Sequence, residues 1–178
     1  VSIKPREIRL LPRGNWLDDS GPIMVPAIPE FLGTIHPDQK RATRLDLANW
    51  LVDSQNGVGG QTARVMANRL WHHTFGSGIV PTPSDFGTAG APPTHPELLD
   101  WLAAEFVQPT FLESQPWSMK GLLRLLVTSE AFRRSSAPTR KGMEADTNAV
   151  MLWRFSPRRV EAEVIRDSIL QASGSLSH

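Results

Sequence analysis

The sequence predicts a mainly α fold: about five helices in a compact bundle with long ordered loops rich in glycine and proline, and an extended N-terminal segment. Three observations predict it. Apolar residues recur at the spacing of one helix face in several stretches. Residues that favour helix ends flank those stretches. The 15 prolines and 13 glycines cluster between the stretches rather than inside them.

Residues 1–37 are expected to be extended, because prolines interrupt every stretch long enough for a helix. A short strand is expected within residues 7–11, followed by a turn at 13–15, which together allow one short hairpin. We therefore divide the chain into an extended segment, 1–37, and a helical domain, 38–178. The helical domain is expected to be a fragment of a larger protein.

The first two helices are expected at about 42–53 and 63–75. Leu47, Trp50 and Leu51 form the apolar stripe of the first helix. The second helix follows a glycine-rich break, with Thr62 as its cap and Gly76 as its stop. Tryptophan recurs at similar places in three helices and is expected in the core, at Trp50, Trp71 and Trp101.

The third and fourth helices have clear start signals. Thr94 and Glu97 are spaced as a capping box around Pro96, and Ser118 is the expected cap of the fourth helix. The fourth helix should end near residues 132–134, followed by a polar, irregular stretch over 135–147.

The fifth helix is expected at about 158–172, with Gly174 just beyond its end. Its helical spacing directs one apolar face inward. That face consists of Val160, Val164, Ile165, Ile169 and Ala172.

Composition excludes several classes of protein. The chain has 178 residues and no cysteine, which excludes disulfides, covalent haem attachment, zinc–thiolate sites, iron–sulfur clusters and a cysteine nucleophile within it. No apolar run approaches the ~18 residues that a membrane span needs. A net charge of +1 does not indicate a nucleic-acid-binding protein.

Charge is nevertheless segregated along the chain. Residues 81–116 carry five acids and no lysine or arginine, whereas residues 117–159 carry nine bases and three acids. The two segments could neutralise each other across the fold. Alternatively, residues 117–159 form a basic face for an anionic partner such as a glycan.

A polar cluster is predicted around the second helix. Arg64, Asn68 and His72 share one helix face at i, i+4 and i+8, and Asp85 and His95 follow in the next loop. Two interpretations remain open: a buried network that only fixes geometry, or an anion, sugar or catalytic site.

A second set of charged residues is typical of structural salt bridges. Its members are Arg44, Asp46, Arg69, Arg158, Arg159, Glu163, Arg166 and Asp167. We expect no metal site, because the adjacent His72 and His73 point about 100° apart on a helix and cannot chelate one ion together.

An ordered series of motifs resembles a planctomycete secreted-domain family of unknown function. The resemblance extends from about residue 13 to 174. The motifs that carry it lie at residues 44–51, 62–65, 68–71, 75–80, 85–87, 94–103 and 158–167.

The resemblance implies a setting rather than a reaction. Members lie in the C-terminal half of large secreted or periplasmic proteins that also contain a cytochrome c-like domain, so haem c is expected only in a separate domain. We therefore favour a non-catalytic scaffold or interaction module that docks that domain or a cell-surface or glycan partner. An enzyme or half-site acting on polysaccharide is the alternative, and an anion-binding module using residues 117–159 is a third. We expect neither a nucleic-acid partner nor a membrane span.

Overall fold

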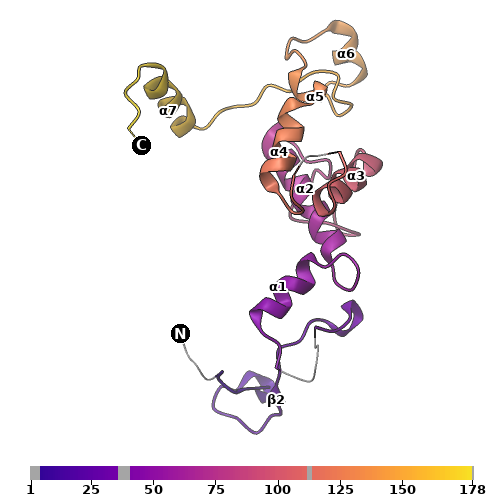
Figure 1. Ribbon diagram of the computed structural model, residues 1–178, viewed down its shortest axis with the longest axis vertical. Coiled ribbons are helices and arrows are strands. Elements are labelled where there is room, and N and C mark those ends of the chain that lie inside the picture. The colour runs from indigo at the N-terminus through magenta and orange to yellow at the C-terminus, as the bar shows by residue number, and fades with distance from the viewer. Residues whose placement is uncertain (1–4, 36–40, 112–113, 178) are drawn as a thin grey trace. The chain divides into compact units, whose positions relative to one another are not determined.

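The computed structural model describes residues 5–35, 41–111 and 114–177 (Figure 1). Helices account for 45% of it, which confirms the mainly α prediction. The described residues form seven α-helices rather than five, because short helices occupy two predicted loops or helix ends. The chain divides into two compact units, residues 1–64 and 65–178. The predicted boundary after residue 37 falls outside the described residues.

The N-terminal unit begins with the expected short hairpin. Strand β1 (Ile8–Arg9) pairs antiparallel with β2 (Ile23–Met24), and Ile8 lies opposite Met24. A 3₁₀ turn, η1 (Pro12–Gly14), follows β1, and a second, η2 (Glu30–Leu32), follows β2. The hairpin is tight at Gly21, where a Cβ atom would lie 1.9 Å from the carbonyl oxygen of Leu10.

Helix α1 (Arg44–Val52) lies within the predicted range. Thr43 caps it: the backbone N–H of Asp46 donates to the Thr43 hydroxyl, and the Asp46 carboxylate accepts from the Thr43 backbone N–H at 2.7 Å. No residue of α1 is buried: Leu47 and Leu51 of its apolar stripe are each 40% exposed, and Trp50, expected in the core, is half-buried. The spacing defined a face, but the described part of the N-terminal unit does not cover it.

Helix α2 (Gly59–Phe75) starts earlier than predicted, and the division between the two units falls within it. Thr62 is therefore inside the helix and not its cap. The glycine-rich stretch permits this start, because a Cβ atom on Gly59 would lie 2.5 Å from the carbonyl oxygen of Val52. The predicted stop is confirmed at Gly76, which has a positive φ of 89°.

Helices α3 (Pro96–Val107) and α4 (Met119–Thr128) pack against each other in the C-terminal unit. The predicted cap of α4 is confirmed, since Ser118 accepts from the N–H of Gly121 at 3.1 Å. The predicted capping box of α3 is wrong. His95 is the N-cap residue, and the Thr94 hydroxyl instead donates to the carbonyl of Ile79 at 3.2 Å.

Two short helices follow α4. Helix α5 (Glu130–Arg133) is separated from it by Ser129, and α6 (Arg140–Ala145) lies in the stretch expected to be irregular. Thr139 caps α6 by accepting from the N–H of Gly142 at 3.2 Å. That glycine lies against the indole of Trp153, where a Cβ atom would come within 2.6 Å of the ring.

Helix α7 (Ala162–Ala172), yellow in Figure 1, begins four residues later than predicted. Gly174 follows its last turn with a φ of 71°, as expected of a C′ glycine. The predicted inward face is wrong, because no residue of α7 is buried and Ile169 is 63% exposed.

The core of the C-terminal unit comes from α2, α3, α4 and the 79–80 segment. Trp71 is buried there as predicted, whereas Trp101 is 42% exposed and Trp50, in the N-terminal unit, is half-buried. Fully or nearly fully covered apolar side chains are Ala67, Leu70, Phe75, Ile79, Val80, Leu99, Leu102, Ala103, Phe106, Leu122 and Leu126.

Candidate functional site

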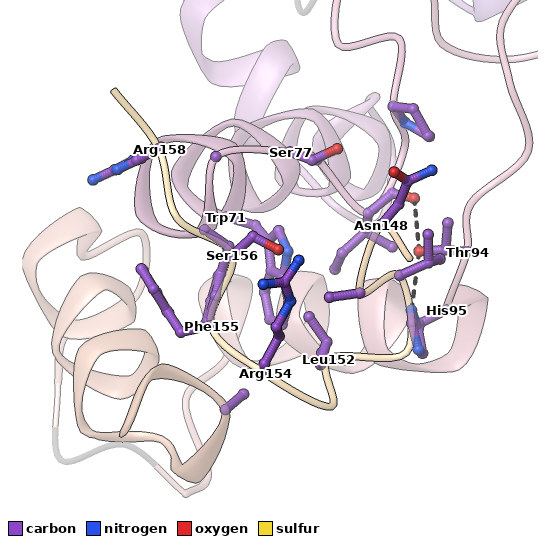
Figure 2. A pocket seen from close by; sticks show the side chains of 18 of the residues that line it. Trp71, Ser77, Thr94, His95, Asn148, Leu152, Arg154, Phe155, Ser156 and Arg158 are labelled. Atoms are coloured by element: carbon purple, nitrogen blue, oxygen red, sulfur yellow. Dashed lines mark hydrogen bonds between the residues drawn. The ribbon is translucent and has the colours of Figure 1, made fainter. Parts of the chain in front are cut away.

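The C-terminal unit contains a pocket of about 430 Å³ (Figure 2). Its walls are the end of α2, the 76–79 turn that follows, the start of α3 and the segment 148–158. A volume of this size falls within the ~300–1,000 Å³ typical of small-molecule sites.

A buried amide holds the first wall in place. Asn68, on α2, is fully buried and bonds twice to Val80: its Nδ2 donates to the carbonyl at 3.1 Å, and its Oδ1 accepts from the N–H at 2.8 Å. Gly78 lies directly over this amide, where a Cβ atom would come within 2.8 Å of Nδ2. Asn68 and Gly78 therefore fix the turn that carries Ser77 and Ile79.

Thr94 joins this turn to the start of α3. Its N–H donates to the carbonyl of Ile79 at 2.8 Å. Its hydroxyl also lies 2.9 Å from Nδ1 of His95. These contacts place the imidazole of His95 at the pocket wall (Figure 2).

Asp146 shapes the wall formed by the segment 148–158. Its carboxylate accepts from the N–H groups of Val150 at 3.0 Å and Met151 at 2.7 Å. Its carbonyl accepts from the indole N–H of Trp153 at 2.7 Å. Ala149 and Leu152 adopt positive φ angles of 52° and 56°, a strained conformation for residues other than glycine. Asp146 therefore holds a bent segment that no local propensity favours.

Aromatic rings form the apolar side of the pocket. Trp71 and Phe75 stack with centroids 4.2 Å apart, and Phe155 lies 6.1 Å from Phe75. Phe132 meets Phe155 edge-on at 5.2 Å. This cluster joins α2, α5 and the 148–158 segment, and gives the pocket a rigid wall.

The charged groups of the pocket are arginines. Arg158 donates to the carbonyl of His73 at 2.6 Å, at the C-terminal end of α2, where a cation is favoured. Arg154 lies over the Trp153 ring at 5.1 Å and makes one long contact to the carbonyl of Thr147, at 3.4 Å. No carboxylate is among the lining residues, so the pocket is electropositive.

A profile of the family described as "Protein of unknown function (DUF1553)", short name PSD1, matches residues 43–178. The chain belongs to this family. No curated protein and no solved structure gave a significant match. Within the described residues, no helix is long and apolar enough to cross a membrane.

The predicted polar cluster is dispersed in this PSD1 member. Of its five residues, His95 alone lines the pocket, while Asn68 lies behind the wall. His72 is half-buried and its ring meets that of His73 edge-on at 5.7 Å. Asp85 is exposed in the following loop, and Arg64 belongs to the N-terminal unit, where it contacts the carbonyl of Gly60.

The predicted salt-bridge residues have separate roles. Asp46 serves the capping box of α1, and Arg158 binds a backbone carbonyl. Arg166 and Asp167 pair at 3.0 Å on the exposed surface of α7, where such a pair contributes little. The remaining members are exposed: Arg44, Arg69, Arg159 and Glu163.

Two acids that hold backbone segments in place, Glu105 and Asp146, were not among the predicted site residues. Glu105 is buried, and its carboxylate accepts from the N–H groups of Thr110 at 3.1 Å and Phe111 at 3.0 Å, and from the Thr110 hydroxyl. It follows Leu98 and Leu102 on the apolar face of α3, and an acid at such a position indicates a buried, hydrogen-bonded carboxylate. Asp146 gave no comparable signal.

Among the described residues, Asp18 and Asp53 have a lowered pKa, and both lie in turns of the N-terminal unit. The backbone N–H groups of Asn56 and Gln55 lower the pKa of Asp53. The hydroxyl and backbone N–H of Ser20 lower the pKa of Asp18. Neither lies in the pocket. Within the described residues, no three histidines or acids are grouped to hold a metal ion.

Proposed function

We propose that this PSD1 chain is a non-catalytic interaction module that docks another folded domain of the same extracytoplasmic polypeptide. One observation carries the proposal: large apolar side chains lie uncovered on the N-terminal unit and on α7. The family resemblance supports a cytochrome c-like domain as the partner. It also supports a secreted or periplasmic planctomycete protein as the setting.

Helix α7 lacks any covering surface within the described chain. Its 11 residues include none that is buried, and Val164, Ile165 and Ile169 are each about half exposed or more. A helix shorter than ~12–15 residues is marginal in water on its own. Burying one such side chain contributes ~1.5–3 kcal/mol, so a partner that covers this face would stabilise the helix substantially.

The N-terminal unit presents more apolar surface of the same kind. Phe31, Trp16 and Leu17 are 86%, 78% and 71% exposed. Contiguous apolar surface is typical of sites that bind proteins or membranes. Further exposed members are Ile8, Leu10, Leu11, Ile23, Met24, Val25, Leu32, Leu45, Leu47, Leu51 and Val52.

Charge around α7 favours a protein partner over a lipid surface. Residues 158–172 contain three arginines and three acids, so this segment has no net charge. Helices that lie on anionic membranes are rich in lysine and arginine on their polar face. Helix α7 itself has one arginine and two acids, so it lacks the cationic face of such helices and suits a protein partner instead.

The test measures binding of the cytochrome c-like domain of the same polypeptide to this chain. Analytical sedimentation monitors the complex through the absorbance of the haem. We expect saturable binding. The double substitution Ile165→Ser and Ile169→Ser removes two apolar anchors, so affinity should fall ~100-fold or more. The matched control on the same helix, Glu163→Ser with Gln171→Ser, should leave affinity within ~3-fold.

Circular dichroism checks that both variants fold, as expected for changes at exposed positions. Equal binding by the apolar and control variants would contradict the proposal. Light scattering on the chain alone tests whether a second copy of the chain covers α7 instead. A dimer that the apolar double variant abolishes would show that it does.

A further inference from the structure

Of the two arginines that line the pocket, Arg154 has the weaker contacts, because Arg158 has a carbonyl at 2.6 Å. The Nε of Arg154 is buried and has no hydrogen-bond partner within the described residues. Its Nη2 reaches only the carbonyl of Thr147, at 3.4 Å. Within the described chain, no carboxylate forms an ion pair with it. The side chain as a whole is only half-buried, so its Nη groups can bind an acceptor from outside the chain, and an anion supplies one.

Neutral polar side chains surround the same space. Ser77, Asn148 and Ser156 line the pocket, and none of their side chains makes a hydrogen bond among the described residues. Figure 2 shows the Arg154 guanidinium at the centre near Ser156, with Asn148 and His95 on the opposite side and Arg158 directed away. Unused donors and acceptors therefore come from two walls of the pocket, the 76–79 turn and the segment 148–158.

The shape of the cation selects the anion. Guanidinium is planar, and its two Nη groups form a fork that matches the two oxygens of a carboxylate. Within the described residues, Nη1 of Arg154 makes no hydrogen bond and Nη2 makes only the 3.4 Å contact to Thr147, so this fork is open to a ligand. The apolar wall of Trp71, Phe75 and Phe155 lies beside this fork and can accept the face of a ring.

The neutral groups select the ring. A purely apolar ring would leave the side chains of Ser77, Asn148 and Ser156 unpaired in a partly closed pocket, which lowers affinity. A ring that carries hydroxyl groups satisfies them and still packs on the aromatic wall. We propose that this pocket binds a uronic acid unit, with its carboxylate on Arg154 and its hydroxyls on Ser77, Asn148 and Ser156.

This site is independent of the docking faces, because none of its lining residues belongs to α7 or to the N-terminal unit. It also differs from the predicted polar cluster, of which it contains only His95. Its cations come from the basic segment 117–159, so the structure concentrates part of that charge in a defined pocket.

The test is calorimetric titration of the whole chain with sodium glucuronate, the methyl ester of glucuronic acid and sodium acetate. We expect saturable binding of glucuronate. The ester keeps the ring and lacks the charge, and acetate keeps the charge and lacks the ring, so each should bind at least 10-fold more weakly. Equal binding of glucuronate and its ester, equal binding of acetate, or no saturable binding of glucuronate would overturn the proposal.

Variants locate the site. Arg154→Gln should weaken glucuronate at least 10-fold and remove its advantage over the ester. The matched control is Arg124→Gln, since Arg124 is an exposed arginine of the same basic segment, on α4, and lies outside the lining. If Arg154→Gln does not fold, Asn148→Ala serves in its place, because the exposed Asn148 supports no described hydrogen bond through its side chain. A loss of binding in Arg124→Gln equal to that in the pocket variant would contradict the assignment.

Discussion

Helices α4 and α7 have nearly the same length and similar amphipathic sequences, yet they differ completely in burial. In α4, Leu122 and Leu126 are packed in the core beside α3. In α7, Val164, Ile165 and Ile169 meet solvent. Helical spacing therefore identifies an apolar face, but it does not identify the surface that covers it. The difference separates a helix that is covered within the described chain from one that is not covered there.

The largest expected effect is the loss of stability caused by a cavity under α4. Leu122→Ala removes a fully buried side chain and should lower the free energy of unfolding by about 2–5 kcal/mol, measured by urea denaturation. Ile169→Ala makes a similar change on α7 and should alter the free energy of unfolding of the isolated chain by less than about 0.5 kcal/mol. Comparable losses in the two variants would show that α7 is packed as firmly as α4.

The next effect concerns the buried amide behind the pocket. Asn68→Ala leaves both backbone groups of Val80 without partners, and each such group costs about 1–3 kcal/mol, so we expect a loss of about 2–4 kcal/mol. The control is Asn15→Ala in the N-terminal unit, where the exposed side chain accepts from the N–H of Leu17. Its effect should stay below about 0.5 kcal/mol. Equal thermal shifts for the two variants would refute the role given to Asn68.

Removal of the N-cap side chain should also affect α4 and α7 differently, with a smaller loss of stability. Ser118→Ala removes the hydroxyl that accepts from Gly121 and should cost about 1 kcal/mol in urea denaturation. Glu161, the N-cap residue of α7, makes no such bond, so Glu161→Ala should leave stability unchanged within error. A larger effect at Glu161 than at Ser118 would be incompatible with these contacts.

The smallest effect is a pH dependence in the N-terminal unit. The N–H groups of Asn56 and Gln55 lower the pKa of Asp53 in the folded chain, so its carboxylate stabilises the turn above the ordinary pKa of aspartate. This contribution is lost as the pH falls through the lowered pKa. An NMR titration of the Asp53 carboxyl carbon should give a midpoint below the ordinary value. A midpoint at or above it would show that the turn is not formed.

Local signals predicted much of the fold. The cap at Ser118, the C′ glycine at Gly174 and the short hairpin each depend on a few neighbouring residues, and the structure contains all three. The predictions that were wrong depended on distant parts of the chain. The carbonyl of Ile79 accepts from the Thr94 hydroxyl that a capping box would use. The predicted inward face of α7 needs a covering surface, and the described chain provides none.

The pocket was harder to predict than the fold. His95 and Asn68 were both among the candidates, but Asn68 supports the wall rather than lining the space. Arg154 and Asn148 reach the pocket through the bend that Asp146 holds. That bend places Ala149 and Leu152 at positive φ, which their residue types do not announce.

The proposed docking is tested most directly by hydrogen exchange on α4 and α7, with and without the proposed partner, a cytochrome c-like domain. Alone, the amides of α4 should be protected and those of α7 should exchange rapidly, since only α4 contributes to a buried core. Addition of the domain should slow exchange in α7 by 10-fold or more and leave α4 unchanged. Strong protection of α7 in the isolated chain, or unchanged exchange there when the domain is bound, would contradict the account.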